Sequence, residues 1–115
     1  MDDIEKKLDP EHGLAEVRLS GRIQMYDTDR LEEALNELVE SDHMRLIIDM
    51  TAVTYICSSA LGVLIAAKRK VMKHEGEIRL VVSRGEIFEL LKVTMLDKLF
   101  RVYMSLEDAR QSIAH

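Results

Sequence analysis

The chain has 115 residues, of which 47% are hydrophobic and 32% are charged, and this balance predicts one folded domain rather than a disordered segment. Its formal net charge of −5 argues against direct binding to nucleic acid. The single cysteine, Cys57, excludes an internal disulfide, and the longest apolar run, residues 60–67, is far shorter than the ~20 residues of a membrane helix. We therefore expect a cytoplasmic protein that does not enter a membrane.

The first half of the chain predicts a strand, a helix and a second strand. Ala15, Val17 and Leu19 alternate with polar residues up to Gly21, as in a half-buried strand. A helix should begin near residues 27–29, because the apolar residues 31, 34, 35, 38 and 39 share one helical face. Residues 45–50 (RLIIDM) are typical of a strand buried on both faces. Residues 1–13 are charged and are expected to form an N-terminal tail or an edge strand.

The second half of the chain continues the alternation of strands and helices. A helix is expected from Ser58 to the neighbourhood of Gly76, which would serve as its C-terminal glycine, and residues 77–82 predict another strand. Ser83 and Ser105 each precede an acidic residue by three positions, which is capping-box spacing and predicts two more helix starts. Residues 100–104 are expected to add a short edge strand.

Strands that alternate with helices at this pace predict an α/β fold. We expect a single domain over residues 14–115, with a mixed or largely parallel sheet of four to five strands packed with about four helices. Within it, Gly62 should let its helix approach the sheet closely. The methionines, Met25 included, are expected to pack in the core or at its edge, and they are residues 25, 44, 50, 72, 95 and 104.

No motif for catalysis or metal binding accompanies this pattern. The four histidines lack metal-ligand spacing, there is no second cysteine, and no glycine-rich phosphate loop occurs. A Ser-His-Asp set stays open because its members meet only in space, but no nucleophile-elbow motif surrounds the serines. We therefore expect no enzyme activity, no catalytic residues, no metal and no cofactor.

Several blocks of the sequence resemble the motifs of STAS domains, notably those of anti-sigma factor antagonists. The stretch 19–23 (LSGRI) is similar to the family's "SGxL", and 91–100 (LKVTMLDKLF) is similar to "LxLTGLDxLF", with the likeness continuing over 102–109. Between them, 49–53 (DMTAV) followed by 57–62 (CSSALG) resembles "DLSxV" followed by "DSSGLG". The likeness extends from about Leu14 to Ile113.

The resemblance implies a partner switch. In such proteins the unphosphorylated antagonist binds a serine-kinase anti-sigma factor and frees the sigma factor. The kinase then phosphorylates a serine of the antagonist, and a metal-dependent serine phosphatase, a further candidate partner, resets it. Aligned on the motif, Ser59 takes the phosphoacceptor position, and Ser58 is expected to cap the helix beside it. We expect the protein to be a monomer or a weak dimer. The residues expected to bind the anti-sigma factor are Gln24, Met25, Tyr26, Thr28, Cys57, Ser58, Ser59 and Leu61.

The chain departs from the family pattern around the serines. Cys57 and Gln24 stand where aspartates are usual, and Ala60 replaces a glycine. The missing carboxylates could orient the hydroxyl or contact the kinase, so slow phosphorylation is expected. Two alternatives stay open: a STAS interaction module without phosphorylation, as in a transporter or stressosome-like scaffold, and a nucleotide-binding STAS domain. For Cys57, the role of a small, buried, nearly apolar residue at a strand-helix junction is favoured over that of a redox-reactive thiol.

Overall fold

The computed structural model, which describes residues 1–113, is built on one five-stranded sheet. Its strands lie side by side in chain order, and they are β1 (Glu5–Asp9), β2 (Leu14–Ile23), β3 (Arg45–Ile56), β4 (Glu77–Val81) and β5 (Arg101–Tyr103). β1 runs antiparallel to β2, and the other neighbours are parallel. The expected mixed α/β sheet is confirmed, with an edge strand within residues 1–13 and another within residues 100–104.

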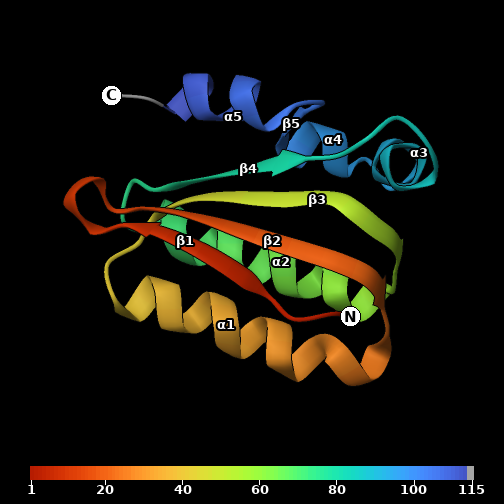
Figure 1. The fold of residues 1–115 in the computed structure, drawn as a ribbon, viewed down its shortest axis with the longest axis horizontal. Helices are drawn as coiled ribbons and strands as arrows, with labels where there is room; N and C mark the ends of the chain where they lie inside the picture. Colours follow the sequence, from red (N-terminus) through yellow and green to blue (C-terminus); the bar gives the residue numbers. More distant parts are fainter. Residues whose placement is uncertain (114–115) are drawn as a thin grey trace.

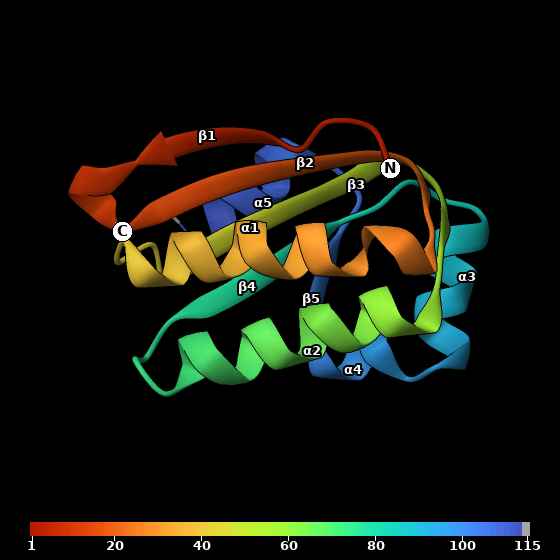
Figure 2. The ribbon, with the colours of Figure 1, turned by 90° about the horizontal axis from the view of Figure 1, so that it is seen from below.

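The helices cover the two faces of this sheet unequally. α1 (Thr28–Glu40) and α2 (Ser58–Met72) lie on one face, and α5 (Leu106–Ile113) lies on the other (Figure 1). α3 (Glu86–Val93) and α4 (Leu96–Leu99) follow β4 at one end of the molecule (Figures 1 and 2). Two 3₁₀ turns, η1 (Pro10–His12) and η2 (Met25–Asp27), follow β1 and precede α1. None of the helices within residues 1–113 is long and apolar enough to cross a membrane.

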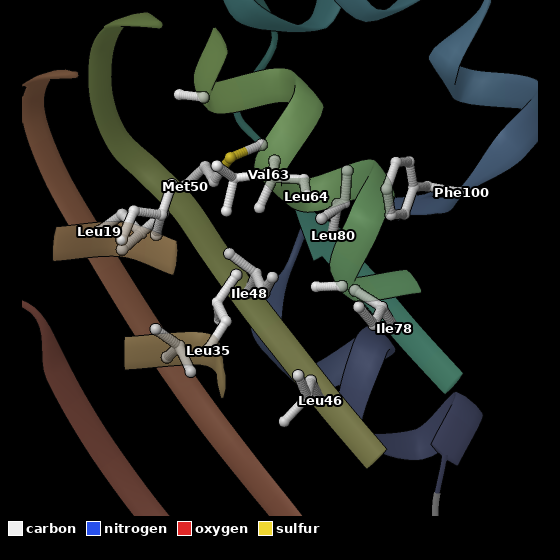
Figure 3. Close-up of a cluster of buried hydrophobic side chains, with 14 of the residues drawn as sticks. Leu19, Leu35, Leu46, Ile48, Met50, Val63, Leu64, Ile78, Leu80 and Phe100 are labelled. Atoms are coloured by element: carbon white, nitrogen blue, oxygen red, sulfur yellow. The ribbon is translucent and has the colours of Figure 1, made fainter. Parts of the chain in front are cut away.

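The main core lies between the sheet and the helices α1 and α2. The predicted alternation in β2 is confirmed, since Ala15, Val17 and Leu19 are fully buried. In β3, Ile48 joins this core, whereas its neighbour Ile47 belongs to a smaller cluster under α5, so the strand is buried on both faces as expected. Figure 3 shows the main core, in which leucine, isoleucine and valine side chains of the sheet and α2 meet.

The two predicted capping boxes behave differently. Ser105 is confirmed as a cap, because its Oγ accepts a hydrogen bond of 3.1 Å from the amide of Asp108 at the start of α5. Ser83 is not a cap: α3 begins only at Glu86, after Gly85, whose φ of +142° is a conformation that residues with a side chain rarely adopt. This glycine turns the chain away from the helical path, so Ser83 lies outside the first turn. Its Oγ instead donates to the carbonyl of Thr51.

The predicted C-terminal glycine of α2 has a different role. α2 ends at Met72, and it is Glu75 that adopts the left-handed conformation, with φ 60°. A Cβ atom on Gly76 would lie 2.2 Å from the carbonyl oxygen of Met44. Gly76 is therefore required by close approach of two backbones rather than by helix termination.

Candidate functional site

The paired serines lie in the first turn of α2, directly after β3. The residue at the N-cap position is Cys57, whose backbone is extended (φ −80°, ψ 162°) and whose carbonyl accepts a hydrogen bond of 3.2 Å from the amide of Leu61. Ser58 is therefore the first helical residue and Ser59 the second. The prediction that Ser58 caps the helix is wrong, because the helix begins one residue earlier than the sequence suggested.

This correction changes what Ser58→Ala should do. With no side-chain capping bond at the start of α2, the substitution should alter the free energy of unfolding by less than about 0.5 kcal/mol. Ser105→Ala is the matched control and should cost about 1 kcal/mol, because it removes a real capping bond. Urea denaturation of both variants measures this, and an equal loss in both would contradict the boundary of α2 described above.

The hydroxyl of Ser59 is exposed and lies between two other polar groups. Its Oγ is 3.1 Å from Oγ1 of Thr28 and 3.3 Å from Sγ of Cys57. Since Thr28 begins α1 and Ser59 lies in the first turn of α2, this contact joins the N-terminal ends of the two helices, which Figure 2 shows at the same end of the molecule. Both ends carry a partial positive charge, which favours added negative charge at Ser59.

Cys57 is half-buried and takes part in the same network. Burial raises the pKa of its thiol, but the neighbouring polar groups, first the Ser59 hydroxyl and then the Ala60 amide and the Thr28 hydroxyl, act in the opposite direction. Their sum holds the pKa below its ordinary value. The sulfur thus lies beside the Ser59 hydroxyl at the N-cap position, where the family pattern has an aspartate, and a thiol is a weaker hydrogen-bonding group than a carboxylate.

Gln24, the other residue that departs from the family pattern, forms hydrogen bonds with Asp27 in η2. Its backbone carbonyl accepts a hydrogen bond of 3.0 Å from the amide of Asp27, and the carboxylate of Asp27 accepts one of 2.8 Å from the amide of Gln24. Burial raises the pKa of Asp27, but this bond, together with the N-terminal ammonium and Arg30, brings the pKa below its usual range. The sequence indicated only that α1 should begin near residue 27, whereas the Asp27 side chain fixes the turn before that helix.

The turn η2 presents two large apolar side chains to solvent beside the serines. Met25 is 76% exposed and Tyr26 is 80% exposed, and η2 contacts α2. Leu61 is different: it is 7% exposed and packs in the main core, so the expectation that it contacts a partner is wrong. Leu61 follows Ser59 by two positions, which on a helix places it towards the opposite face.

Gly62 lies on the outer face of α2, with the serines. A Cβ atom there would meet nothing within 4 Å, and the residue is exposed. The prediction that Gly62 lets the helix approach the sheet is therefore wrong. Because glycine has no side chain, the surface of α2 is flat at this position, one turn after Ser58 and Ser59.

A STAS-domain family model matches residues 4–109 of the chain. The chain belongs to the STAS family. This STAS protein is 31% identical over 110 residues to the anti-sigma-F factor antagonist RsfB of Mycobacterium tuberculosis, a match that covers 94% of this chain and 88% of the relative. The crystal structure of an anti-sigma factor antagonist from Mycobacterium paratuberculosis superposes with a TM-score of 0.84 at 30% identity, over 99% and 97% of the two chains. The Bacillus protein SpoIIAA in its phosphorylated form shares the fold at 11% identity, with a TM-score of 0.73 over 96% and 99% of the chains.

One group of residues within 1–113 could hold a metal ion, and it lies away from Ser59. Asp9, Glu11 and His12 gather their ligand atoms at the connection between β1 and β2. Figure 1 shows this connection at the opposite end of the molecule from the start of α2. The group is thus separate from the Ser59 site.

Proposed function

We propose that this STAS protein is an anti-sigma factor antagonist that binds a serine-kinase anti-sigma factor, and thereby frees a sigma factor, until Ser59 is phosphorylated. The observation that carries the proposal is the exposed hydroxyl of Ser59 beside the exposed pair Met25 and Tyr26. The names of the Mycobacterium relatives support it. Such a protein is the substrate of its partner, so it needs no catalytic residues of its own, and it acts in the cytoplasm, where sigma factors work.

The η2 turn supplies the binding energy in this proposal. Methionine and aromatic side chains are enriched in the buried centres of interfaces, and a few such residues carry most of the affinity. Met25 and Tyr26 stand on a turn that the reciprocal bonds of Gln24 and Asp27 hold in one shape. A partner therefore meets two apolar side chains on a preorganised turn, and little entropy is lost in ordering the backbone that carries them.

Phosphorylation of Ser59 would then end the complex without unfolding the antagonist. The kinase transfers the γ-phosphoryl group of ATP to Oγ of Ser59, which loses its proton as ADP leaves. The phosphate adds a charge of about −1.5 to −2, which the N-terminal ends of α1 and α2 tolerate. Within an interface, juxtaposed like charges cost several kcal/mol, and every 1.4 kcal/mol is tenfold in affinity.

The experiment that tests the proposal is capture of partners by the tagged full-length protein from its native cytosol, followed by incubation of the purified pair with ATP and phosphosite mapping. We expect an anti-sigma factor with serine kinase activity, and phosphate on Ser59. Tight binding of a protein that never transfers phosphate would favour the non-phosphorylated interaction module. Retention of ATP or GTP by the isolated chain in equilibrium dialysis would favour the nucleotide-binding alternative.

Restoring the family's carboxylates should accelerate this phosphorylation. The thiol of Cys57 is a weak acceptor for the Ser59 hydroxyl, and a mispositioned reacting atom can cost on the order of a hundredfold in rate. We expect Cys57→Asp, alone and combined with Gln24→Asp, to raise the initial rate of phosphate incorporation at least several-fold. Because Asn caps helices about as well as Asp, Cys57→Asn is the control that keeps the cap without the charge, and it should not accelerate the reaction. A wild type as fast as both aspartate variants would show that the carboxylates are dispensable.

A further inference from the structure

A cavity of about 600 Å³ lies beside β5, the last strand of the sheet. Its walls come from α2, β4, α3, α4 and β5. Among the residues that line it, Asp97 is the only acidic one, and the basic ones are Lys68, Arg79, Lys98 and Arg101. The chain as a whole carries a net charge of −5, so this concentration of positive charge runs against its composition.

Two of these cations are neighbours within the sheet. Arg79 in β4 and Arg101 in β5 are register partners on adjacent parallel strands, and like charges placed in this way repel each other. Arg79 is buried and paired with Glu77, but the carboxylate of Glu77 also lies 3.5 Å from Nε of Arg45, so two arginines share it. The pair of strands therefore keeps an excess of positive charge at a cost in stability.

The remaining cations of the cavity have no acidic partner within residues 1–113. Lys68, Lys98 and Arg101 form no ion pair there, although Nζ of Lys68 lies 5.7 Å from the centroid of the Phe100 ring. The phenol of Tyr103 is affected by this charge. A hydrogen bond with Ser112 lowers its pKa, burial opposes that effect, and the charges of Arg79 and Arg101 lower the pKa further.

An unpaired strand edge borders the same cavity. Within the part of the chain that the structure describes, β5 pairs only with β4, so the backbone along its outer edge has no strand partner. Such an edge can take up an extended polypeptide, which adds a strand through main-chain hydrogen bonds. Leu99, which is 41% exposed, and Phe88 supply apolar surface to the cavity. Met95, which was expected to pack at the edge of the core, is instead 58% exposed and does not line it.

We infer that the outer edge of β5 binds an extended acidic segment of a partner protein, whose carboxylates pair with Lys68, Lys98 and Arg101 and whose backbone extends the sheet. Charge complementarity identifies the occupant as acidic, and the unpaired strand edge favours a polypeptide over a small anion. Arg101 suits this role because a guanidinium group can bind a carboxylate through two hydrogen bonds. Lys68 follows Ser59 by nine residues, roughly 13 Å along α2, so this surface is separate from Ser59 and the inference does not rest on the proposed function.

The test is the affinity of the full-length protein for a fluorescein-labelled probe, Glu-Glu-Val-Thr-Val-Thr-Glu-Glu, measured by fluorescence anisotropy at low ionic strength. Arg101→Glu should weaken binding at least tenfold. Arg69→Glu is the matched control, because Arg69 is exposed and adjacent to Lys68 but does not line the cavity, and it should leave the affinity within twofold of the wild type. The melting temperature of Arg101→Glu should equal or exceed that of the wild type, because the new carboxylate neighbours Arg79. That result excludes misfolding as the cause.

A second probe tests the addition of a strand. Replacing the central Thr-Val of the peptide with two prolines removes backbone N–H donors and keeps every glutamate. We expect this probe to bind at least fivefold more weakly than the first. Equal affinity for the two probes would show that charge alone attracts the peptide, and it would overturn the inference.

Three further outcomes would also overturn it. The first is that the wild type does not bind the first probe, or binds it no better than Arg101→Glu does. The second is that inorganic phosphate or ATP binds more tightly than the probe and loses affinity in Arg101→Glu, which would assign the cavity to small anions. The third is self-association in sedimentation that Arg101→Glu abolishes, which would make a second copy of the chain the occupant. Each of these leaves the proposed function at Ser59 standing.

Discussion

Met25→Glu is expected to weaken the complex with the anti-sigma factor by about a hundredfold or more. The side chain of Met25 is 76% exposed, so it contributes little to the fold, and a partner that covers it would have to bury the new carboxylate. Loss of an interface anchor typically costs 2 kcal/mol or more, and about 2.7 kcal/mol corresponds to a hundredfold. Calorimetric titration of the purified pair measures the change, and the circular dichroism spectrum should be unaltered.

Met72→Glu is the control for this experiment. It introduces the same charge on a methionine that is 57% exposed, at the last residue of α2 and away from the serines. Its affinity should stay close to that of the wild type, apart from a small long-range effect that salt screens. If Met25→Glu binds as tightly as Met72→Glu, the contact surface lies away from η2.

Ser59→Ala is expected to abolish phosphate incorporation by the cognate kinase. The substitution removes the acceptor oxygen and its contact with Thr28, and because Ser59 is exposed the loss in unfolding free energy should be no more than about 1 kcal/mol. Ser58→Ala is the neighbouring control and should incorporate phosphate normally. Mass spectrometry of the reaction products measures the stoichiometry in each variant.

Continued phosphorylation of Ser59→Ala would refute the assignment. The hydroxyl of Thr28 lies 3.1 Å from that of Ser59, so it is the first alternative acceptor to map. The double variant Thr28→Val, Ser59→Ala would then show whether phosphate had moved to the neighbouring helix or had always been carried elsewhere.

Local patterns in the sequence were sufficient for most of the fold. The alternation in β2 and the apolar face of α1 each follow from one repeat along the chain, and burial of these residues reproduces them. The run 45–50 is buried on both faces, as expected, but β3 continues to Ile56 with partly exposed residues. The STAS motifs then placed Ser59 in the first turn of α2, where the structure has it.

Four features of the site depended on tertiary structure. Cys57 rather than Ser58 is the N-cap, because the start of a helix is set by the backbone angles of one residue, and serine is a good cap residue whether or not it is used. Gln24 and Asp27 bond to each other, a choice that cap propensity alone does not specify. Gly62 and Met95 carry no local signal of exposure, since the packing of α2 and of the α3–α4 corner decides which side is outermost.

The contact between Thr28 and Ser59 shows the physical reason most directly. The two residues are 31 positions apart, and no periodicity along one element relates them. They meet because β2 and β3 are parallel neighbours whose carboxyl ends lie at the same edge of the sheet, so α1 and α2, which follow them, begin side by side. The sequence by itself determined the secondary-structure elements and the position of Ser59 at the start of α2. The pairing of the strands decided which groups surround the Ser59 hydroxyl.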